Sequence, residues 1–343
     1  MKLSRVGVDL AKNVFQLHGV DRHGTTVLKR RLKRDRWLVA LLDKVEPGCE
    51  IGMEACAGAH HWARELQSRG YRVKLIPPQF VKPYVKSNKN DANDAEAICE
   101  AMSRPNMRYV AVKTVEQQDI QATHRVRAEL ITQRTAKANQ IRGLVAEYGI
   151  VAPLSLQALR VAIPCWLEDA ENGLSDHFRS LLNGMWNDLL SLDDRVHELD
   201  RVIERLANSN AVTRRLQQLR GVGPMVATAL VATVGNAQHY RKSRQMAAAL
   251  GLTPRQYSSG DKDRLFGISK RGDVYLRTLL IHGARSVVAR AKHKDDRLSR
   301  WLTNIATRRH PNVAAVALAN KTARMAWAML RNDSDYDPDF AIR

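Results

Sequence analysis

The sequence predicts an α/β domain at its N-terminus, then a helical spacer, then a mainly α C-terminal domain. Short β-rich runs alternate with amphipathic segments in the first part, and the middle is nearly free of Gly and Pro. A chain of 343 residues can hold two or three domains. We place them at 1–112, 113–208 and 209–331, and we expect the acidic tail 332–343 to be disordered.

Charge narrows the class of partner. The chain carries a net charge of +20 with a pI of about 10.2, so a polyanion such as nucleic acid is the expected partner. The N-terminus has no signal-peptide core and no stretch is apolar enough to span a membrane. The four cysteines form no metal-binding spacing. We therefore expect a cytoplasmic, nucleoid-associated prokaryotic protein with no membrane partner.

The order of elements in the first domain predicts its topology. Strands are expected at 5–10, 14–20, 25–32, 49–53 and 71–76, with helices at 37–45, 61–68 and from Asp91 onward. The resulting order βββαβαβα is that of the ribonuclease-H-like fold. In that architecture the first strand lies centrally and the fourth pairs beside it.

Four acids fall at meaningful places in this topology. Asp9 lies within an apolar strand, where an unpartnered acid is costly, and Glu54 ends the fourth strand. Asp91 and Asp94 are spaced i, i+3 in the first turn of a helix. Convergence of the four would suit a two-metal site for phosphoryl transfer. The alternatives are a strand-end Asp facing water and acids that only complement a helix N-terminus.

The spacer contains two long helical patterns. The range 116–148 predicts one helix with basic faces, which suits a solvated helix or contacts to a phosphate backbone through Arg125, Arg127 and Arg134. The range 178–206 has an a/d seam of apolar residues that includes Leu181, with charged residues such as Asp193 at the outer positions. That seam could pair with the first helix or with another protomer.

The third domain opens on a turn with a possible phosphate contact. Gly221 and Gly223 lie between two apolar helical patterns, which is typical of a helix-hairpin-helix-like motif. Its backbone N–H groups and the following helix N-terminus could hold a DNA phosphate. The alternative is a plain turn between two core helices.

Several segments together resemble one known family. They are Val6–Asp9, Gly52–Gly58, Lys89–Ala95 and the run Gly-Leu-Thr-Pro-Arg-Gln-Tyr-Ser-Ser-Gly at 251–260. They resemble the DEDD transposases of insertion sequences, which are related to the Piv/MooV invertases, and the similarity covers nearly the whole chain. The resemblance implies a RuvC-like N-terminal domain and a C-terminal serine domain. It also implies that the four acids named above bind Mg²⁺, or another divalent ion such as Mn²⁺.

The resemblance maps a serine nucleophile to Ser259. Ser258 is the second choice, and Ser269 is a third whose place before a helix favours a cap. A serine hydroxyl needs activation by a base or a metal, so a site shared with the distant acids is expected. Nearby cations could neutralise phosphate charge in the transition state. They are Arg255, Lys262, Arg264, Lys270 and Arg271.

These observations favour a transposase that cuts and rejoins the DNA of its own insertion sequence. The resemblance implies a structured guide RNA from the element and a homo-oligomer, either a dimer or a tetramer. One rival is a hydrolytic junction-resolving nuclease that uses the acids alone. Another is a non-catalytic nucleic-acid-binding protein, which would leave Asp9 unexplained.

Overall fold

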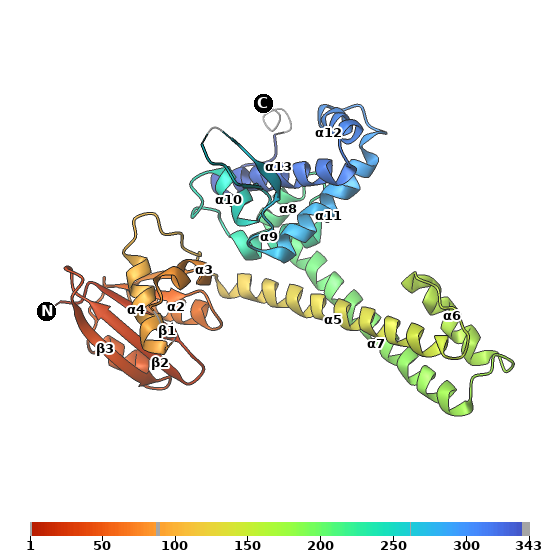
Figure 1. The fold of residues 1–343 in the computed structure, drawn as a ribbon, viewed down its shortest axis with the longest axis horizontal. Coiled ribbons are helices and arrows are strands. Elements are labelled where there is room, and N and C mark those ends of the chain that lie inside the picture. The colour runs from red at the N-terminus through yellow and green to blue at the C-terminus, as the bar shows by residue number, and fades with distance from the viewer. Residues whose placement is uncertain (1, 87–89, 261, 338–343) are drawn as a thin grey trace. The chain divides into compact units, whose positions relative to one another are not determined.

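The computed structural model describes residues 2–86, 90–260 and 262–337. Contacts divide the chain into two compact units, Met1–Val115 and Glu116–Arg343. The helices expected to form a separate spacer belong to the same unit as the C-terminal helices. Each unit is described by itself below, and Figure 1 labels the elements. No helix of the described residues is both long and apolar enough to cross a membrane.

The N-terminal unit is built on one five-stranded sheet. Its elements are β1 (Arg5–Leu10), β2 (Val14–Val20), β3 (Thr26–Lys33), α1 (Trp37–Leu42), β4 (Glu50–Glu54), α2 (Ala59–Gln67), β5 (Arg72–Ile76), α3 (Pro78–Val81), η1 (Lys82–Tyr84) and α4 (Asp91–Met102). The strand order is β3-β2-β1-β4-β5, with β1 antiparallel to β2 and parallel to β4. The predicted order of the strands and of α1, α2 and α4 is confirmed, as are the central β1 and its neighbour β4, whereas α3 and η1 were not predicted.

Alternating side chains on the strands build three layers. Val6 and Val8 on β1 pack into a core with Trp37 of α1 and Leu66 of α2. Gly7, between those valines, faces the opposite side and lies against α4. The sheet is therefore covered by α1 and α2 on one face and by α4 on the other.

The C-terminal unit is mainly helical. Its elements are α5 (Val115–Ala146), α6 (Leu156–Glu168), α7 (Asp176–Ser209), α8 (Ala211–Leu216), α9 (Pro224–Val234), α10 (Ser243–Ala249), β6 (Pro254–Gln256), β7 (Leu265–Ile268), α11 (Val274–Ala291), α12 (Arg297–Arg308) and α13 (Pro311–Asn332). Strands β6 and β7 pair as an antiparallel hairpin, which the sequence did not predict. The long α5 helix confirms the prediction for 116–148.

Helices α5 and α7 lie side by side and run in opposite directions (Figure 1). Ion pairs join them in antiparallel order: Arg127 with Asp200, Arg134 with Asp193 and Lys137 with Asp188. The seam of α7 thus packs within its own chain. The partners, which the sequence left open, are α5 and α6, which share a core with α7, and α9, which also packs against it.

The buried stripe on α7 differs from the predicted seam. Leu182 is buried, whereas the predicted Leu181 is 51% exposed. Asp193, predicted on the outer surface, is only 5% exposed and is held by Arg134 and Arg160. A straight helix has about 3.6 residues per turn, so its buried stripe drifts away from a strict heptad. The drift places Asp193 inside, where the two arginines neutralise its charge.

The turn between α8 and α9 is shaped by close packing. Gly221 has φ of +80°, and a Cβ there would lie 2.8 Å from the backbone oxygen of Gly283 on α11. Only glycine permits both that backbone conformation and that approach. This favours the plain-turn interpretation for Gly221. Gly223 is extended and precedes Pro224 at the start of α9, so its phosphate contact stays a prediction.

The expectation of a disordered tail is wrong for its first residues. Arg215 donates to the carbonyl oxygen of Asp333 at 2.6 Å and pairs with its carboxylate. The backbone N–H of Tyr336 donates to Gln218, and the Tyr336 ring packs on the C-terminal core. Residues 338–343 of the predicted tail lie outside the described residues.

Candidate functional site

Two of the predicted acids share one face and one edge of the sheet. Residues two apart on a strand point to the same side. Asp9 therefore lies on the same face as Gly7, and Glu54 on the same face as Gly52, where α4 packs. The parallel register pairs Val8 with Met53, so Asp9 and Glu54 are neighbours at the ends of β1 and β4.

Helix α4 brings the other two acids towards the same edge. A Cβ on Gly7 would meet Ala95 and Cys99, and a Cβ on Gly52 would meet Ile98 and Met102. Arg5, at the start of β1, interacts with Cys99. Helix α4 therefore runs antiparallel to β1 and β4. Its first turn, which carries Asp91 and Asp94, lies at the strand ends that hold the acids.

The start of α4 is fixed by a side-chain cap. Asn90 accepts a hydrogen bond from the backbone N–H of Asn93 at 2.8 Å. Such a cap satisfies one of the helix's unpaired donors and defines where the first turn begins. Lys89, part of the motif quoted above, lies outside the described residues. Asp91 is exposed and Asp94 half-buried, so both can also complement the positive helix N-terminus.

The negative charge at this edge affects the pKa of a neighbouring thiol, that of Cys56. Burial raises the pKa of Cys56, and the nearby carboxylates of Glu54 and Asp9 raise it further. Carboxylate oxygens are the ligands that Mg²⁺ prefers, so the donor set fits such an ion in its chemistry. Among residues 2–86, 90–260 and 262–337, no three His, Cys, Asp or Glu side chains are close enough to form a metal site. The acids share the edge without closing on a common point.

The predicted nucleophile lies on the β6–β7 hairpin of the C-terminal unit. Ser259 is exposed and forms an isolated bridge with Lys262, whose backbone N–H donates to the Ser259 carbonyl at 3.3 Å. Ser258 differs, because its hydroxyl accepts a hydrogen bond from the Gln256 side chain at 2.9 Å. The five cations predicted around the serine are all exposed.

The base of the hairpin is tightly packed. Arg277, on α11, is buried and donates to the backbone oxygens of Leu250 and Arg271 at 3.1 and 3.2 Å. A Cβ on Gly272 would lie 1.8 Å from the backbone oxygen of Ala249. The exposed part of the hairpin is therefore anchored by a tightly packed base.

Ser269 is not the cap of the helix that follows the hairpin. Asp273 has that role, because its carboxylate accepts from the backbone N–H of Leu276 at 2.8 Å. Ser269 instead belongs to the base of the hairpin, where its backbone N–H donates to the carbonyl of Thr253.

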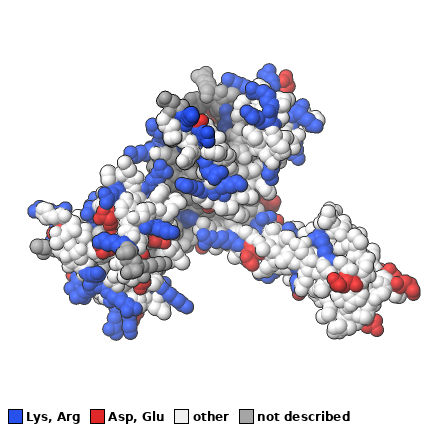
Figure 2. All heavy atoms as spheres, viewed as in Figure 1, with Lys and Arg blue, Asp and Glu red and all other residues white. Residues whose placement is uncertain are grey.

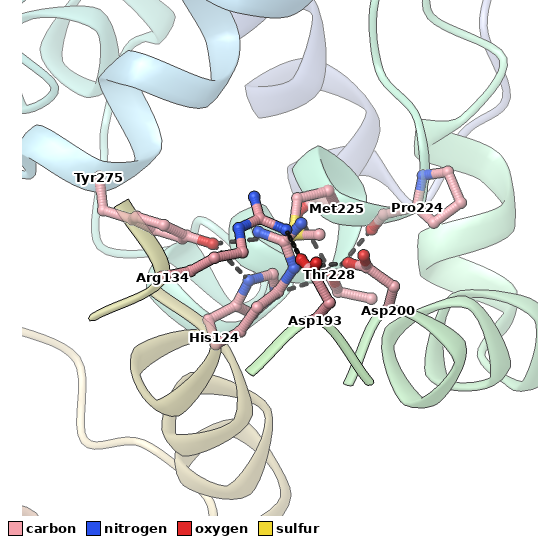
Figure 3. Close-up of polar contacts among 9 residues, drawn as sticks. His124, Arg134, Asp193, Asp200, Pro224, Met225, Thr228 and Tyr275 are labelled. Atoms are coloured by element: carbon pink, nitrogen blue, oxygen red, sulfur yellow. Dashed lines mark hydrogen bonds and ion pairs between the residues drawn. The ribbon is translucent and has the colours of Figure 1, made fainter. Parts of the chain in front are cut away.

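A buried histidine network, which no sequence pattern predicted, joins α5, α9 and α11 (Figure 3). His124 on α5 lies 2.9 Å from both the Tyr275 hydroxyl and the Thr228 hydroxyl. Thr228 donates to the Pro224 carbonyl, so its oxygen accepts from Nε2–H of His124, and Nδ1 accepts from Tyr275. Burial, with a smaller effect of the Arg127 guanidinium, lowers the pKa of His124 to about 4.

This network lines an open cavity of about 380 Å³ between α5, α9 and the start of α11. Its polar lining includes Gln121, Arg125 and Asp273. No sequence signal identified His124, because one histidine in a polar helical stretch has no distinctive spacing.

The predicted phosphate contacts on α5 divide into two kinds. Arg127 and Arg134 are half-buried and pair with Asp200 and Asp193 on α7, at 2.5 and 3.0 Å (Figure 3 shows these acids and Arg134). The structure therefore does not support them as DNA contacts, since their charges are already paired. Arg125 is exposed and stays a prediction.

Charge is unevenly distributed over the surface (Figure 2). Lys and Arg side chains spread over the visible faces of both units, with Asp and Glu side chains among them on the N-terminal unit. Exposed acids gather instead where α6 ends and α7 begins. They are Glu168, Asp169, Glu171 and Asp176. That end of the helix pair is poorly suited to a polyanion.

An acid edge on a mixed sheet and an exposed basic hairpin are consistent with a DNA-processing enzyme. Two family models match the chain: "Transposase IS116/IS110/IS902 family" at residues 213–299 and the DEDD transposase of IS110 at residues 6–150. The chain belongs to the IS110/IS116 family of insertion-sequence transposases.

Relatives match over almost their full lengths. A probable family 20 transposase of Pseudomonas aeruginosa is 50% identical over 98% of this chain and 100% of its own. The transposase for IS1111A of Coxiella burnetii is 45% identical over 96% of this chain and 90% of its own. The transposase for IS1328 of Yersinia enterocolitica is 41% identical over 94% of this chain and 96% of its own.

Proposed function

We propose that this transposase cuts and rejoins DNA with Ser259 as the nucleophile. The observation that carries the proposal is the place of Ser259, exposed on a hairpin among arginines and lysines. Its Oγ would attack a backbone phosphorus and release a DNA hydroxyl, giving a phosphoserine ester. Attack by a DNA hydroxyl on that ester would then restore the serine and join the strands. The bond energy is kept in the ester, so no ATP is required.

The acid edge is proposed to serve the same reaction. Asp9, Glu54, Asp91 and Asp94 would hold Mg²⁺ or Mn²⁺, since DEDD transposases typically use a divalent metal. When bound, such an ion polarises a phosphate oxygen and stabilises the charge that develops on it. Asp9 and Glu54, at adjacent strand ends, provide a fixed pair of donors, and the first turn of α4 provides the others.

The partners beyond DNA are also proposals. A structured guide RNA is supported by the family resemblance and by the net charge of +20. A dimer or tetramer is supported by exposed apolar side chains around α6, chiefly Val151, Leu154 and Val161. These side chains lie beside the acidic end of the helix pair, which is a surface better suited to protein than to DNA.

The test is a covalent adduct between protein and DNA. Wild-type protein mixed with end-labelled element DNA and Mg²⁺ should give a labelled band that survives denaturing electrophoresis. Ser259→Ala should give neither adduct nor recombinant product, and Ser258→Ala should give both. Both side chains are exposed, so each substitution should change stability by no more than about 0.5 kcal/mol.

The same gel separates the rival functions. Adduct from Ser259→Ala but not from Ser258→Ala would move the nucleophile by one residue. Mg²⁺-dependent cleavage without any adduct would favour a hydrolytic nuclease that uses the acid edge alone. Binding in a native gel, with neither cleavage nor adduct in the denaturing gel, would favour a non-catalytic role.

A further inference from the structure

The β6–β7 hairpin has two chemically different faces. Below an irregularity in the ladder, Gln256 pairs with Leu265 and Ser259 with Lys262. Paired residues share a face, and faces alternate along each strand. One face therefore carries Gln256 and Leu265, together with Ser258 and Asp263. The side-chain hydrogen bonds from Gln256 to Ser258 and to Asp263 agree with this assignment.

The other face gathers cations and rings around the proposed nucleophile. It carries Arg255, Tyr257, Ser259, Lys262, Arg264 and Phe266. The guanidinium of Arg255 lies over the Phe266 ring at 6.0 Å from its centroid, which places these two side chains together. We call this the serine face.

The two aromatic rings on the serine face are exposed to solvent. Tyr257 is 74% exposed and Phe266 is 50% exposed, although each could bury a large apolar area. Exposed rings interleaved with arginines are the elements of a single-strand binding surface, where bases stack on the rings and cations follow the phosphates. Among the described residues of the hairpin, the acidic residue is Asp263, and it lies on the face opposite the serine face.

We propose that Tyr257 and Phe266 stack on unpaired DNA bases beside the phosphate that Ser259 attacks. The inference rests on the proposed function, because Ser259 determines which nucleotides come near. Tyr257 and Ser259 are two residues apart in the arm of the hairpin that follows β6, which is about 7 Å along an extended chain. Stacking at Tyr257 would hold the neighbouring phosphate close to the serine hydroxyl. Tyr257 and Phe266 are thus positioning residues, and the DNA must be unpaired there for its base faces to be accessible.

The experiment measures binding separately from chemistry. Full-length protein is titrated into a single-stranded DNA oligonucleotide containing 2-aminopurine, whose fluorescence changes on stacking, and into the same sequence as duplex. Tyr257→Ala combined with Phe266→Ala should weaken single-strand binding about tenfold or more and remove the fluorescence change. Duplex binding and its salt dependence should be unaltered, because no charge is removed.

The matched control lies on the opposite face. Leu265→Ala combined with Gln256→Ala removes an exposed apolar side chain and a polar one. Single-strand binding, the fluorescence change, duplex binding and its salt dependence should all be unchanged. If the control pair weakens binding equally, or if the aromatic pair binds as wild type does, the stacking proposal is wrong. Loss of binding to an RNA oligonucleotide but not to DNA would also overturn it.

The outcome is independent of the nucleophile. Ser259→Ala should bind and quench as wild type does even though it forms no adduct. Normal quenching with no adduct in the wild type would reject the serine mechanism and keep the stacking surface. An adduct in the wild type, together with normal binding by the variant that lacks both rings, would reject the stacking surface and keep the serine mechanism.

Discussion

The two proposed reaction sites are built in opposite ways. The acid edge is fixed from beneath: strands β1 and β4 are central in the sheet, and Gly7 and Gly52 let α4 approach them closely. Ser259 lies on a short exposed hairpin whose rigid part is its base, where Arg277 and Gly272 are packed.

The difference indicates a division of labour. A site that must hold charged groups at fixed separations benefits from a packed sheet, because its geometry is set before the substrate arrives. A nucleophile that must form and release a bond to DNA benefits from exposure. Its positioning then depends on contacts with the substrate, which the cations and rings of the serine face can provide.

The largest expected effect comes from breaking the acid edge without changing its shape. Asp9→Asn or Asp91→Asn keeps the side-chain volume and removes the negative charge. Strand transfer should fall about 10³-fold or more, since an oriented metal supplies several kcal/mol of transition-state stabilisation. DNA binding should stay within a few-fold of wild type, because removing an acid does not remove a phosphate contact. Rates from a plasmid recombination assay and affinities from filter binding provide the two readouts.

Glu100 provides the matched control on the same helix. It lies in the last turns of α4, is exposed and pairs with Arg104, away from the strand ends. Glu100→Gln should recombine DNA at close to the wild-type rate. Equal loss of activity in Glu100→Gln and Asp91→Asn would show that α4 needs negative charge in general, and the metal assignment would lose its support.

A smaller effect should distinguish the buried His124 network from the exposed hairpin. Burial lowers the pKa of His124 from 6.5 to about 4, so the unfolded chain binds a proton more readily than the folded one. Stability is therefore full above pH 6.5 and is lost as the pH falls towards 4. Between pH 7 and pH 5 this one group should cost the C-terminal unit about 2 kcal/mol.

Thermal unfolding across that range tests the assignment. His124→Gln removes the titrating group and should flatten the decline, whatever its effect on stability at pH 7. Burial also lowers the pKa of His239, so some decline should remain. A slope identical to that of wild type would show that His124 is not the group responsible. At pH 7 the variant should still form the Ser259 adduct if it is folded, because His124 supports the unit without touching the hairpin face.

The two sites also differ in how far the sequence could predict them. The acid edge follows from strand order and from period-two alternation, so Asp9 and Glu54 could be placed on one edge before any coordinates. Their separation from Asp91 and Asp94 could not, because it depends on how closely α4 approaches Gly7. The hairpin was missed, since Pro254–Gln256 and Leu265–Ile268 are too short to show alternation. Asp193 was misplaced because charge alone indicated an outer position, and its partners lie 59 and 33 residues away.

The smallest expected effect separates two arginines that the sequence made equivalent. Arg125 is exposed on α5, whereas Arg127 is paired with Asp200. Arg125→Ala should weaken DNA binding by a few-fold and reduce the slope of log affinity against log salt by about 0.9, which is the loss of one phosphate contact. Arg127→Ala should leave that slope unchanged and lower the free energy of unfolding by about 1 to 3 kcal/mol, because it leaves the Asp200 carboxylate without its partner. If both variants lower the slope equally, the α5–α7 pair opens on binding DNA, and the paired arginines belong to the interface after all.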